Sequence, residues 1–372
     1  MADTILITGG AGFIGSHLAD ELLAAGYQVR VLDNMAAQVH GPDSLRPSYL
    51  APEVELVPGD IREPGIVRQA LAGVNAVFHF AASVGVGQSM YQVRDYVATN
   101  DLGTANLLQY LIERPVEKLI VASSMSIYGE GLYQDSDGGQ VERGERDVSL
   151  FRHGIWELYD SKGRLLTPVP TPEWKRPALS SVYALSKYVQ EHLCLMLGRA
   201  YAIPTVALRF FNVYGTRQAL SNPYTGVLAI FASRLLNGRP PMVFEDGEQK
   251  RDFIHVRDVA RACRLALEKP AAAGEAVNIG SGNTYTIRHL AHKLATILGR
   301  EELTPEITGR YRMGDIRHCF ADISRARTLL DFEPQISLEA GLTELAEWLS
   351  DQIAVDRYDQ ASQELAFRGL TV

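Results

Sequence analysis

The sequence predicts an α/β fold, in which a doubly wound parallel sheet is followed by a smaller C-terminal α/β lobe. Short apolar runs alternate with stretches of helical spacing through the first half of the chain. Strands separated by helices pair in parallel, with helices on both faces of the sheet. From residue 213 onward, Pro, Gly and Arg interrupt shorter elements, as expected for a separate lobe. The length of 372 residues also exceeds what one compact core usually needs.

The strands and helices of the first half follow from these runs. We expect a helix over residues 16–25, with Gly26 well placed to end it. Residues 91–113 and 182–199 also have helical apolar spacing. The expected buried strands are residues 4–8, 28–32, 54–57, 76–80, 119–122 and 205–210.

Residues 130–178 interrupt this alternation, because glycines, charges and polar residues concentrate there. We expect an insertion with little regular structure that lies over the active site, since long loops in compact domains are usually functional or mobile. Its Trp156, Tyr159 and Trp174 either cap a ligand or form the insertion's own small core. The expected organisation is a cofactor domain over 1–212 with this insertion, a substrate lobe over 213–350 whose segment 253–281 returns to the first domain, and a tail over 351–372 without an assigned function.

The composition excludes several classes of protein. The formal net charge of -8 argues against nucleic acid as a partner. The three cysteines, Cys194, Cys263 and Cys319, are far apart and suggest neither a disulfide framework nor a metal site. The sequence has no run of 18 apolar residues, so it predicts no membrane span. We therefore expect a cytoplasmic protein with buried free thiols.

A glycine-rich turn joins the first predicted strand to the first helix. Gly9, Gly12 and Gly15 have the spacing of a Rossmann-type dinucleotide site, with Phe13 and Ile14 between the last two. Glycines allow a pyrophosphate to approach the backbone, and the helix N-terminus offers free N–H groups. Such a turn alone is a weak signal, but a strand before it and a helix after it are the context that the motif requires.

Carboxylates and small residues at the ends of the next strands complete the cofactor prediction. Asp33 lies 21 residues after Gly12, where a carboxylate binds the adenosine ribose hydroxyls and repels a 2′-phosphate, so NAD is favoured over NADP. Asp60 follows the third strand, within reach of the adenine amino group. Small residues after the fourth strand leave room for a dinucleotide, in the run Phe80, Ala81 and Ala82.

Tyr183 and Lys187 are four residues apart on a predicted helix and therefore share one face. A tyrosine with a pKa near 10 is a poor base at neutral pH, but an ammonium group and a positive nicotinamide ring both favour the phenolate. Tyr183 can then remove a hydroxyl proton while hydride leaves the same carbon. Ser124, at the end of the preceding strand, is placed to hydrogen-bond that oxygen. These three residues are the predicted catalytic set.

Together these residues resemble the extended short-chain dehydrogenase/reductase superfamily, and within it the NAD-dependent nucleotide-sugar epimerases and dehydratases. The resemblance covers residues 4–348 apart from the insertion. Beyond the glycine turn, Asp33 and the Tyr–Lys pair, it rests on the segments Asp60–Ile61, NDLGT (100–104), SSMSIYG (123–129), RFFNVYG (209–215), RDFIHVRDV (251–259) and NIG (278–280).

The resemblance implies a two-lobed enzyme that binds a dTDP- or UDP-linked sugar in the cleft between its lobes. It adds Asn34, Ile61, Asn100 and Ser123 to the NAD contacts, and Ser126 to the sugar contacts beside Ser124. Contacts to the diphosphate fall on Asn212, Arg251 and Arg312, with Asp315 near the nucleotide ribose. Arginine suits this role because its forked donors match phosphate oxygens. The resemblance also implies a homodimer, formed through the helices at 91–113 and 182–199, and no metal.

The residues after Ser124 bear on the reaction type. Dehydratases of this family place Thr-Asp-Glu where this chain has Ser124, Met125 and Ser126, and decarboxylases carry a Glu at the Met125 position. Neither pattern is present in this chain. Met125 cannot transfer a proton, so the residues disfavour both the dehydratase and the decarboxylase reaction. The resemblance therefore favours a 4-epimerase, in which NAD takes the C4 hydride, the 4-keto sugar rotates, and the hydride returns to the other face.

Two further segments bear on the substrate. GIWE (154–157) and NVYGTRQALSNPY (212–224) are similar to segments of dTDP-L-rhamnose 4-epimerases, which would make dTDP-6-deoxy-L-talose the product. Three alternatives remain open. They are a UDP-glucose/UDP-galactose-type 4-epimerase, an NAD(P)H-dependent reductase of nucleotide 4-keto sugars, and a non-enzymatic NAD-sensing protein.

Overall fold

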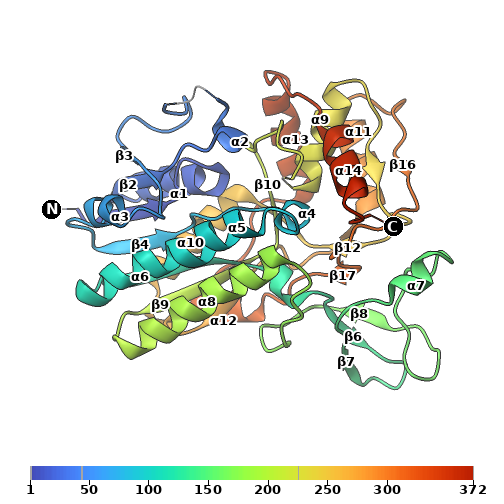
Figure 1. Ribbon diagram of the computed structural model, residues 1–372, viewed down its shortest axis with the longest axis horizontal. Helices are drawn as coiled ribbons and strands as arrows, with labels where there is room; N and C mark the ends of the chain where they lie inside the picture. Colours follow the sequence, from blue (N-terminus) through green and yellow to red (C-terminus); the bar gives the residue numbers. More distant parts are fainter. Residues whose placement is uncertain (1, 43–44, 225, 372) are drawn as a thin grey trace.

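The computed structural model describes residues 2–42, 45–224 and 226–371. Its centre is a seven-stranded sheet in the order β14-β9-β5-β4-β1-β2-β3, and all neighbouring strands are parallel (Figure 1). The predicted α/β fold with a Rossmann-type parallel sheet is confirmed. The strands are β1 (Thr4–Thr8), β2 (Gln28–Asp33), β3 (Glu55–Pro58), β4 (Ala76–His79), β5 (Lys118–Ser124), β9 (Thr205–Phe210) and β14 (Ala276–Ile279).

The order of the strands reverses between β1 and β4. From β1 the chain continues outward through β2 and β3, and then returns to the other side of β1 to form β4, β5 and β9. In open parallel sheets, ligands bind in the crevice at such a reversal, beyond the carboxyl ends of the strands. This topology directs attention to the residues that follow β1, β4 and β5.

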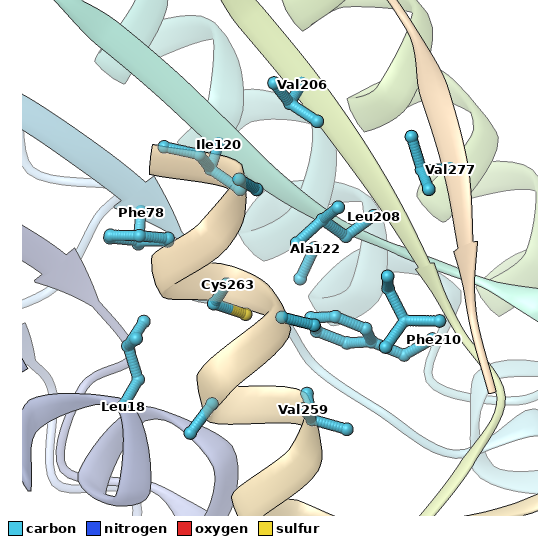
Figure 2. Packing of buried hydrophobic residues seen from close by; sticks show 14 of the residues in the cluster. Leu18, Phe78, Ile120, Ala122, Val206, Leu208, Phe210, Val259, Cys263 and Val277 are labelled. Atoms are coloured by element: carbon cyan, nitrogen blue, oxygen red, sulfur yellow. The ribbon is translucent and has the colours of Figure 1, made fainter. Parts of the chain in front are cut away.

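Helices cover both faces of the sheet. On one face lie α1 (Phe13–Ala24), α10 (Val256–Glu268) and α12 (Ser324–Leu330). Figure 2 shows Val259 and Cys263 of α10 pointing towards strand residues that include Ile120 and Phe210, all of which are buried. The other face is covered by α3 (Pro64–Ala70), α6 (Gly103–Glu113) and α8 (Val182–Ala200).

Two predicted helices differ from the expectation in detail. Helix α1 begins at Phe13 rather than at residue 16, because Gly12 already has the extended conformation of an N-cap residue. The helix expected over 91–113 is divided into α5 (Val93–Tyr96), a π-helical turn η1 (Val97–Leu102) and α6. π-Helical turns occur mostly as single bulges and frequently at functional sites.

A second hydrophobic core lies apart from the sheet. It is formed mainly by α9 (Val227–Leu236), α11 (Ile287–Ile297) and α13 (Leu338–Leu349). Short strand pairs and a three-stranded sheet accompany these helices. The strands are β10 (Asn212–Tyr214), β11 (Met242–Val243), β12 (Lys250–Arg251), β13 (Phe253–His255), β15 (Tyr285–Thr286), β16 (Glu306–Ile307) and β17 (His318–Cys319).

The insertion contains little regular structure, as its composition predicts, and what there is forms a small sheet and one short helix. Three short strands form an antiparallel sheet in the order β7-β6-β8, and a short helix follows β7. The bounds are β6 (Leu132–Gln134), β7 (Gln140–Glu142), α7 (Val148–Phe151) and β8 (Thr167–Val169). Each strand has only three residues, which is too short for an alternating pattern to stand out in the sequence.

Buried charges join the insertion to the C-terminal lobe. Arg317 has no exposed surface, and its guanidinium bonds to Glu157 of the insertion and to Glu245 and Asp246 of the lobe. Arg146 of the insertion lies 2.6 Å from Glu245. The insertion therefore packs as a fixed part of the molecule.

The C-terminal tail ends in α14 (Tyr358–Phe367), which packs against both halves of the molecule. Arg234 of α9 lies 3.3 Å from Asp356 and from Asp359, and Leu365 is buried in van der Waals range of Gly87. The remaining short helices are α2 (Ala37–His40), α4 (Val86–Ser89), η2 (Met125–Tyr128) and η3 (Pro270–Ala272).

Candidate active site

A cavity of about 420 Å³ opens at the carboxyl ends of β1, β4 and β5. It lies at the reversal of strand order, where the topology predicts a ligand. Fifteen of the residues predicted for cofactor or catalysis line this cavity. They are Gly9, Gly12, Phe13, Ile14, Gly15, Asp33, Asn34, Ile61, Phe80, Ala81, Ala82, Ser123, Ser124, Tyr183 and Lys187.

The glycine turn has the shape of a dinucleotide cradle. Gly9 has a φ of +69°, and a Cβ there would lie 2.9 Å from the backbone of Ala81. A Cβ on Gly15 would lie 2.5 Å from the Cα of Gly10. A side chain at either position would displace the backbone, so both positions require glycine. With glycine there, main-chain N–H groups and the start of α1 reach the cavity wall. These residues fit the pyrophosphate of NAD.

Asp33 is held rigidly at the end of β2. One carboxylate oxygen accepts the N–H of Ala11 at 3.0 Å and the other accepts the N–H of Met35 at 2.9 Å. Nε2 of His40 lies 3.6 Å from the same carboxylate, and His40 also lines the cavity. Asp33 thus connects the glycine turn to the loop after β2, and it lines the cavity.

Asp60, a predicted adenine contact, is not among the residues that line the cavity. Its carboxylate accepts hydrogen bonds from Arg62 and from Asn34, with Arg62 Nη2 at 2.7 Å. The hydrogen bonds from Arg62, with that from Asn34, lower the pKa of Asp60 to about 2. Its direct neighbours Gly59 and Ile61 reach the cavity instead.

Ser124 and Tyr183 come together from β5 and the first turn of α8. The hydroxyl of Ser181 caps α8 by accepting the N–H of Ala184, which fixes the turn that carries Tyr183. Burial raises the pKa of Tyr183, and a hydrogen bond from Ser124 opposes that increase. Ser126, also a predicted sugar contact, donates both its N–H and its hydroxyl to the Ser124 oxygen.

Lys187 lies one turn further along α8 and is only 3% exposed. Burial lowers the pKa of its ammonium group to about 8. Its hydrogen bond goes to the side-chain oxygen of Gln190, at 2.6 Å. Sequence reasoning missed Gln190, because a glutamine in a helix carries no signal of its own.

Asn100, a predicted NAD contact, is fully buried and has a different set of partners. Its side-chain oxygen accepts the N–H of Ser83, and its side-chain nitrogen donates to the carbonyl of Ser83 and to the hydroxyl of Ser186. It lies in the π-helical turn and ties α8 to the loop that follows β4. Asn100 thus shapes the cavity without lining it.

The predicted diphosphate and ribose contacts lie outside the cavity wall. The side-chain oxygen of Asn212 is buried and has no hydrogen-bond partner among the described residues. The guanidinium of Arg251 donates to the backbone carbonyls of residues 250, 316 and 317. Arg312 and Asp315 form an ion pair with a distance of 2.8 Å. An unpaired buried amide oxygen is chemically suited to a ligand that carries a hydrogen-bond donor.

Gln38, Gln88 and Asn222 form a cluster at the cavity that the sequence did not indicate. Nε2 of Gln38 lies 3.1 Å from the side-chain oxygen of Gln88 and 3.0 Å from that of Asn222. Residue 38 follows β2, whereas residue 222 follows β10, so this contact joins distant segments across the cavity.

The insertion contributes none of the described residues that line this cavity. Trp156 packs with Phe151 and Tyr311 in a small cluster. Tyr159 and Trp174 are exposed. The indole of Trp156 therefore packs where the insertion contacts residues 311–318. The buried ion pair between Arg317 and Glu157 holds the insertion at the same place.

Among the described residues, neither a cluster of metal ligands nor a membrane-spanning helix is present. No group of three His, Cys, Asp or Glu side chains in those residues is arranged to hold a metal ion. None of the helices formed by them is both long and apolar enough to span a membrane.

Comparison with known proteins gives consistent matches over most of the chain. Residues 5–145 and 159–280 match the profile of the NAD dependent epimerase/dehydratase family. The dTDP-L-rhamnose 4-epimerase of Burkholderia thailandensis is 34% identical over 353 residues, which cover 94% of this chain and 95% of that protein.

Solved structures agree with the sequence matches. The UDP-glucose 4-epimerase of Thermotoga maritima, solved with UDP-glucose, has a TM-score of 0.75 and 32% identity, covering 93% of this chain and 98% of that one. The UDP-glucuronic acid 4-epimerase of Bacillus cereus, solved with UDP-glucuronic acid and NAD, has a TM-score of 0.73 and 29% identity, covering 93% and 99%.

Proposed function

Because this chain belongs to the NAD-dependent epimerase/dehydratase family, we propose that it inverts C4 of a nucleoside-diphosphate sugar through a transient 4-keto sugar. The observation that carries this proposal is the meeting of Ser124, Tyr183 and Lys187 in the wall of one cavity with the glycine turn. Met125 is buried beside Ser124, where a dehydratase or decarboxylase needs a carboxylate. Ser124, Tyr183 and Lys187 therefore support proton transfer at one sugar hydroxyl, and Met125 offers no group for the elimination of water or carbon dioxide.

When bound, NAD would be held by the glycine turn, Asp33 and the small residues after β4, and it would supply a hydride acceptor for C4 that can give the hydride back to the opposite face. The phenolate of Tyr183 takes the C4 hydroxyl proton and gives it back after the sugar has turned. The hydroxyl of Ser124 donates to the C4 oxygen and holds it in line. The ammonium of Lys187 favours the phenolate form of Tyr183 by its charge. Because the hydride returns, no external reductant is consumed.

The diphosphate must stay anchored while the sugar turns. We assign this role to Asn212, Arg251 and Arg312, with Asp315 at the nucleotide ribose and Ser126 at the sugar. The unpaired buried oxygen of Asn212 supports a ligand that carries a hydrogen-bond donor, such as a sugar hydroxyl, because such groups are costly to leave unsatisfied. The donors that phosphate oxygens accept are the amide N–H groups of Asn212 and the two guanidinium groups. The present hydrogen bonds of Arg251 and Arg312 use only some of the five N–H donors of each guanidinium, and the others are available to phosphate oxygens.

For the substrate we propose dTDP-L-rhamnose, with dTDP-6-deoxy-L-talose as the product. The similarity to the Burkholderia protein supports this choice. Similarity to UDP-sugar 4-epimerases at 29–32% identity supports UDP-glucose and UDP-galactose as the alternative pair. A reductase of 4-keto sugars has the same catalytic set, but it must release its cofactor in every cycle. A non-enzymatic NAD sensor has no need of Tyr183 and Lys187.

We also propose the division of the chain expected from its sequence. It comprises a domain over 1–212 with the insertion, a lobe over 213–350 whose segment 253–281 returns to the sheet, and the tail 351–372.

We further propose a homodimer. Exposed apolar side chains on the two predicted dimer helices support the dimer. They are Val93, Val97, Leu102, Leu185 and Met196.

The test is NMR of purified protein with dTDP-L-rhamnose or UDP-glucose and no added nicotinamide cofactor. Appearance of the C4 epimer supports redox-neutral epimerisation with retained NAD and identifies the substrate. Turnover of a 4-keto sugar only when NADH or NADPH is supplied refutes the epimerase and favours the reductase. The Tyr183→Phe variant should lose turnover by roughly 10²–10⁴-fold, because it lacks the acid–base group.

A further inference from the structure

The ammonium group of Lys187 is held by a residue outside the predicted catalytic set. Lys187 Nζ donates to Gln190 Oε1 at 2.6 Å, and both residues belong to α8. Lys187 is 3% exposed and Gln190 has no exposed surface. Losing the glutamine oxygen would leave the buried ammonium group without this acceptor, which is costly. The protein therefore fixes the direction in which the ammonium group donates.

The other end of the Gln190 amide is tied to α6. Its nitrogen lies 2.9 Å from Oγ1 of Thr104, which is also fully buried. The hydroxyl of Thr104 donates to the carbonyl of Asn100. Because its single proton is used in this way, Thr104 can only accept from Gln190.

His79 completes the chain of hydrogen bonds and fixes its direction. Thr8 Oγ1 accepts the N–H groups of Phe80 and Ala81, both at 3.1 Å, so its own proton is directed to Nδ1 of His79 at 2.8 Å. The proton of the neutral ring then lies on Nε2, which donates to Thr104 at 2.8 Å. Burial and the charge of Lys187 lower the pKa of His79 to about 3, which agrees with a neutral ring.

These contacts leave Gln190 one orientation. Thr104 can only accept here, so the amide nitrogen faces Thr104 and the amide oxygen faces Lys187. A flipped amide would place its N–H groups against the ammonium group and its oxygen against the Thr104 oxygen, which has no proton left to donate. The carboxyl ends of β1 and β4, where Thr8 pairs in register with His79, are thereby connected to the catalytic helix.

We propose that Gln190 is a positioning residue, which acts through Lys187 by directing its ammonium group and favouring its charged form. The inference rests on the proposed role of Lys187 in the reaction. An acceptor on an ammonium group stabilises the protonated state, whereas burial disfavours it. The other titratable groups near Lys187 are Tyr183, Glu191, Cys194 and His79. Glu191 is already paired with Arg209 at 2.6 Å, and Gln190 is the acceptor to which Lys187 donates.

The first measurement is the titration of Lys187 without substrate. The protein contains seven lysines, and ¹³C labelling of the lysine Cε, with Lys187→Arg for assignment, gives the midpoint by NMR. Gln190→Met keeps the length of the side chain and removes the acceptor, so the proton affinity of Lys187 should fall roughly tenfold. Gln190→Glu restores an acceptor and should return the midpoint to at least the wild-type value.

The second measurement is the pH profile of turnover. In Gln190→Met, the alkaline limb of kcat should move down by about one pH unit from the Lys187 midpoint near 8, with little change in the sugar KM. The loss in kcat should therefore be roughly twofold at pH 7 and should approach roughly tenfold well above pH 8. Gln190→Glu should return the alkaline limb of the kcat profile to at least the wild-type pH. An unchanged Lys187 midpoint and an unchanged alkaline limb in Gln190→Met overturn the inference.

Leu193→Ala is the matched control, because Leu193 lies on the same helix and packs in the core without joining these hydrogen bonds. It should lower Tm and leave the Lys187 midpoint unchanged. If it moves the midpoint as far as Gln190→Met does, general loosening of α8 is the cause and the inference fails. If the wild type epimerises no nucleotide sugar but the midpoint moves in Gln190→Met alone, the proposed function is refuted and the control of Lys187 by Gln190 stands.

Discussion

The hydroxyl of Ser126 lies 2.9 Å from that of Ser124 and donates to it, while the N–H of Ser126 donates to the same oxygen at 3.1 Å. The Ser124 oxygen thus accepts two hydrogen bonds, and its own proton is directed outward to Tyr183 or to a sugar oxygen. The orientation of the catalytic hydroxyl is therefore set by its neighbour two residues along the chain.

Removing the Ser126 hydroxyl should weaken this orientation. We expect Ser126→Ala to lower kcat roughly fivefold to tenfold, because one neutral hydrogen bond contributes about 1 kcal/mol. Ser126→Thr keeps the hydroxyl and should retain most of the activity. Steady-state kinetics on the two variants test this, and equal kcat values in both would contradict the orientation argument.

Asp33 should control both the affinity for NAD and its preference over NADP. In Asp33→Asn, an oxygen remains for the N–H of Ala11, but the charge is lost. Hydrogen bonds to the ribose then cease to be charge-assisted, and NAD should bind roughly tenfold to a hundredfold more weakly. Calorimetry with NAD and NADP on NAD-stripped protein measures both. The discrimination against NADP should decrease, and a variant that still rejects NADP as strongly as the wild type would refute the role of the charge.

His79 makes stability depend on pH in a defined window. Its pKa is about 3 in the folded protein and 6.5 when exposed. Between these values the unfolded chain binds one proton more than the folded chain, so stability is lost as the pH falls below 6.5. At pH 5 this loss amounts to about 2 kcal/mol. Urea unfolding at pH 7.5 and 5.0 should show a smaller acid loss in His79→Gln than in the wild type, and an equal loss would exclude His79 as the cause.

Arg317 should determine whether the insertion stays docked. Arg317→Met removes one of the guanidinium groups that neutralise Glu245, whose side chain is only 1% exposed. Because a buried charge loses a partner, the free energy of unfolding should fall by about 3–5 kcal/mol. Limited proteolysis should then cut within residues 130–178. Arg143→Met removes an arginine from the surface of the same insertion and serves as the control, with a change within about 0.5 kcal/mol. Equal protease resistance in both variants would contradict the role of Arg317.

The sheet could be predicted because most of its strands are short apolar runs with clear ends. The run at 205–210 matches β9 exactly in its bounds, and the glycine turn identified β1 and α1 through a backbone requirement. The π-helical turn could not be predicted, since one extra residue in a helical turn leaves the apolar spacing nearly unchanged. The division of the long helix therefore depends on contacts such as those of Asn100 with Ser83 and Ser186.

The candidate site could be predicted only where a residue type is required by the chemistry. Tyr183 and Lys187 stand out because their spacing and their acid–base character coincide. Gln190 and His79 do not, because their roles arise from partners on other elements, Thr104 and Thr8. The partners of Arg251 and Arg312 are likewise set by the tertiary structure, which single-sequence reasoning does not contain.

Strand β14 and helix α10 both come from residues beyond 250, although they complete the sheet and cover its centre. While the chain emerges from the ribosome, the first 212 residues therefore present the unpaired edge of β9 and an uncovered apolar face. Nascent chains in this state are prone to pair with one another. A chain cut after residue 212 should consequently aggregate rather than fold, and the intact chain should benefit from a chaperone that shields this face until α10 has been synthesised.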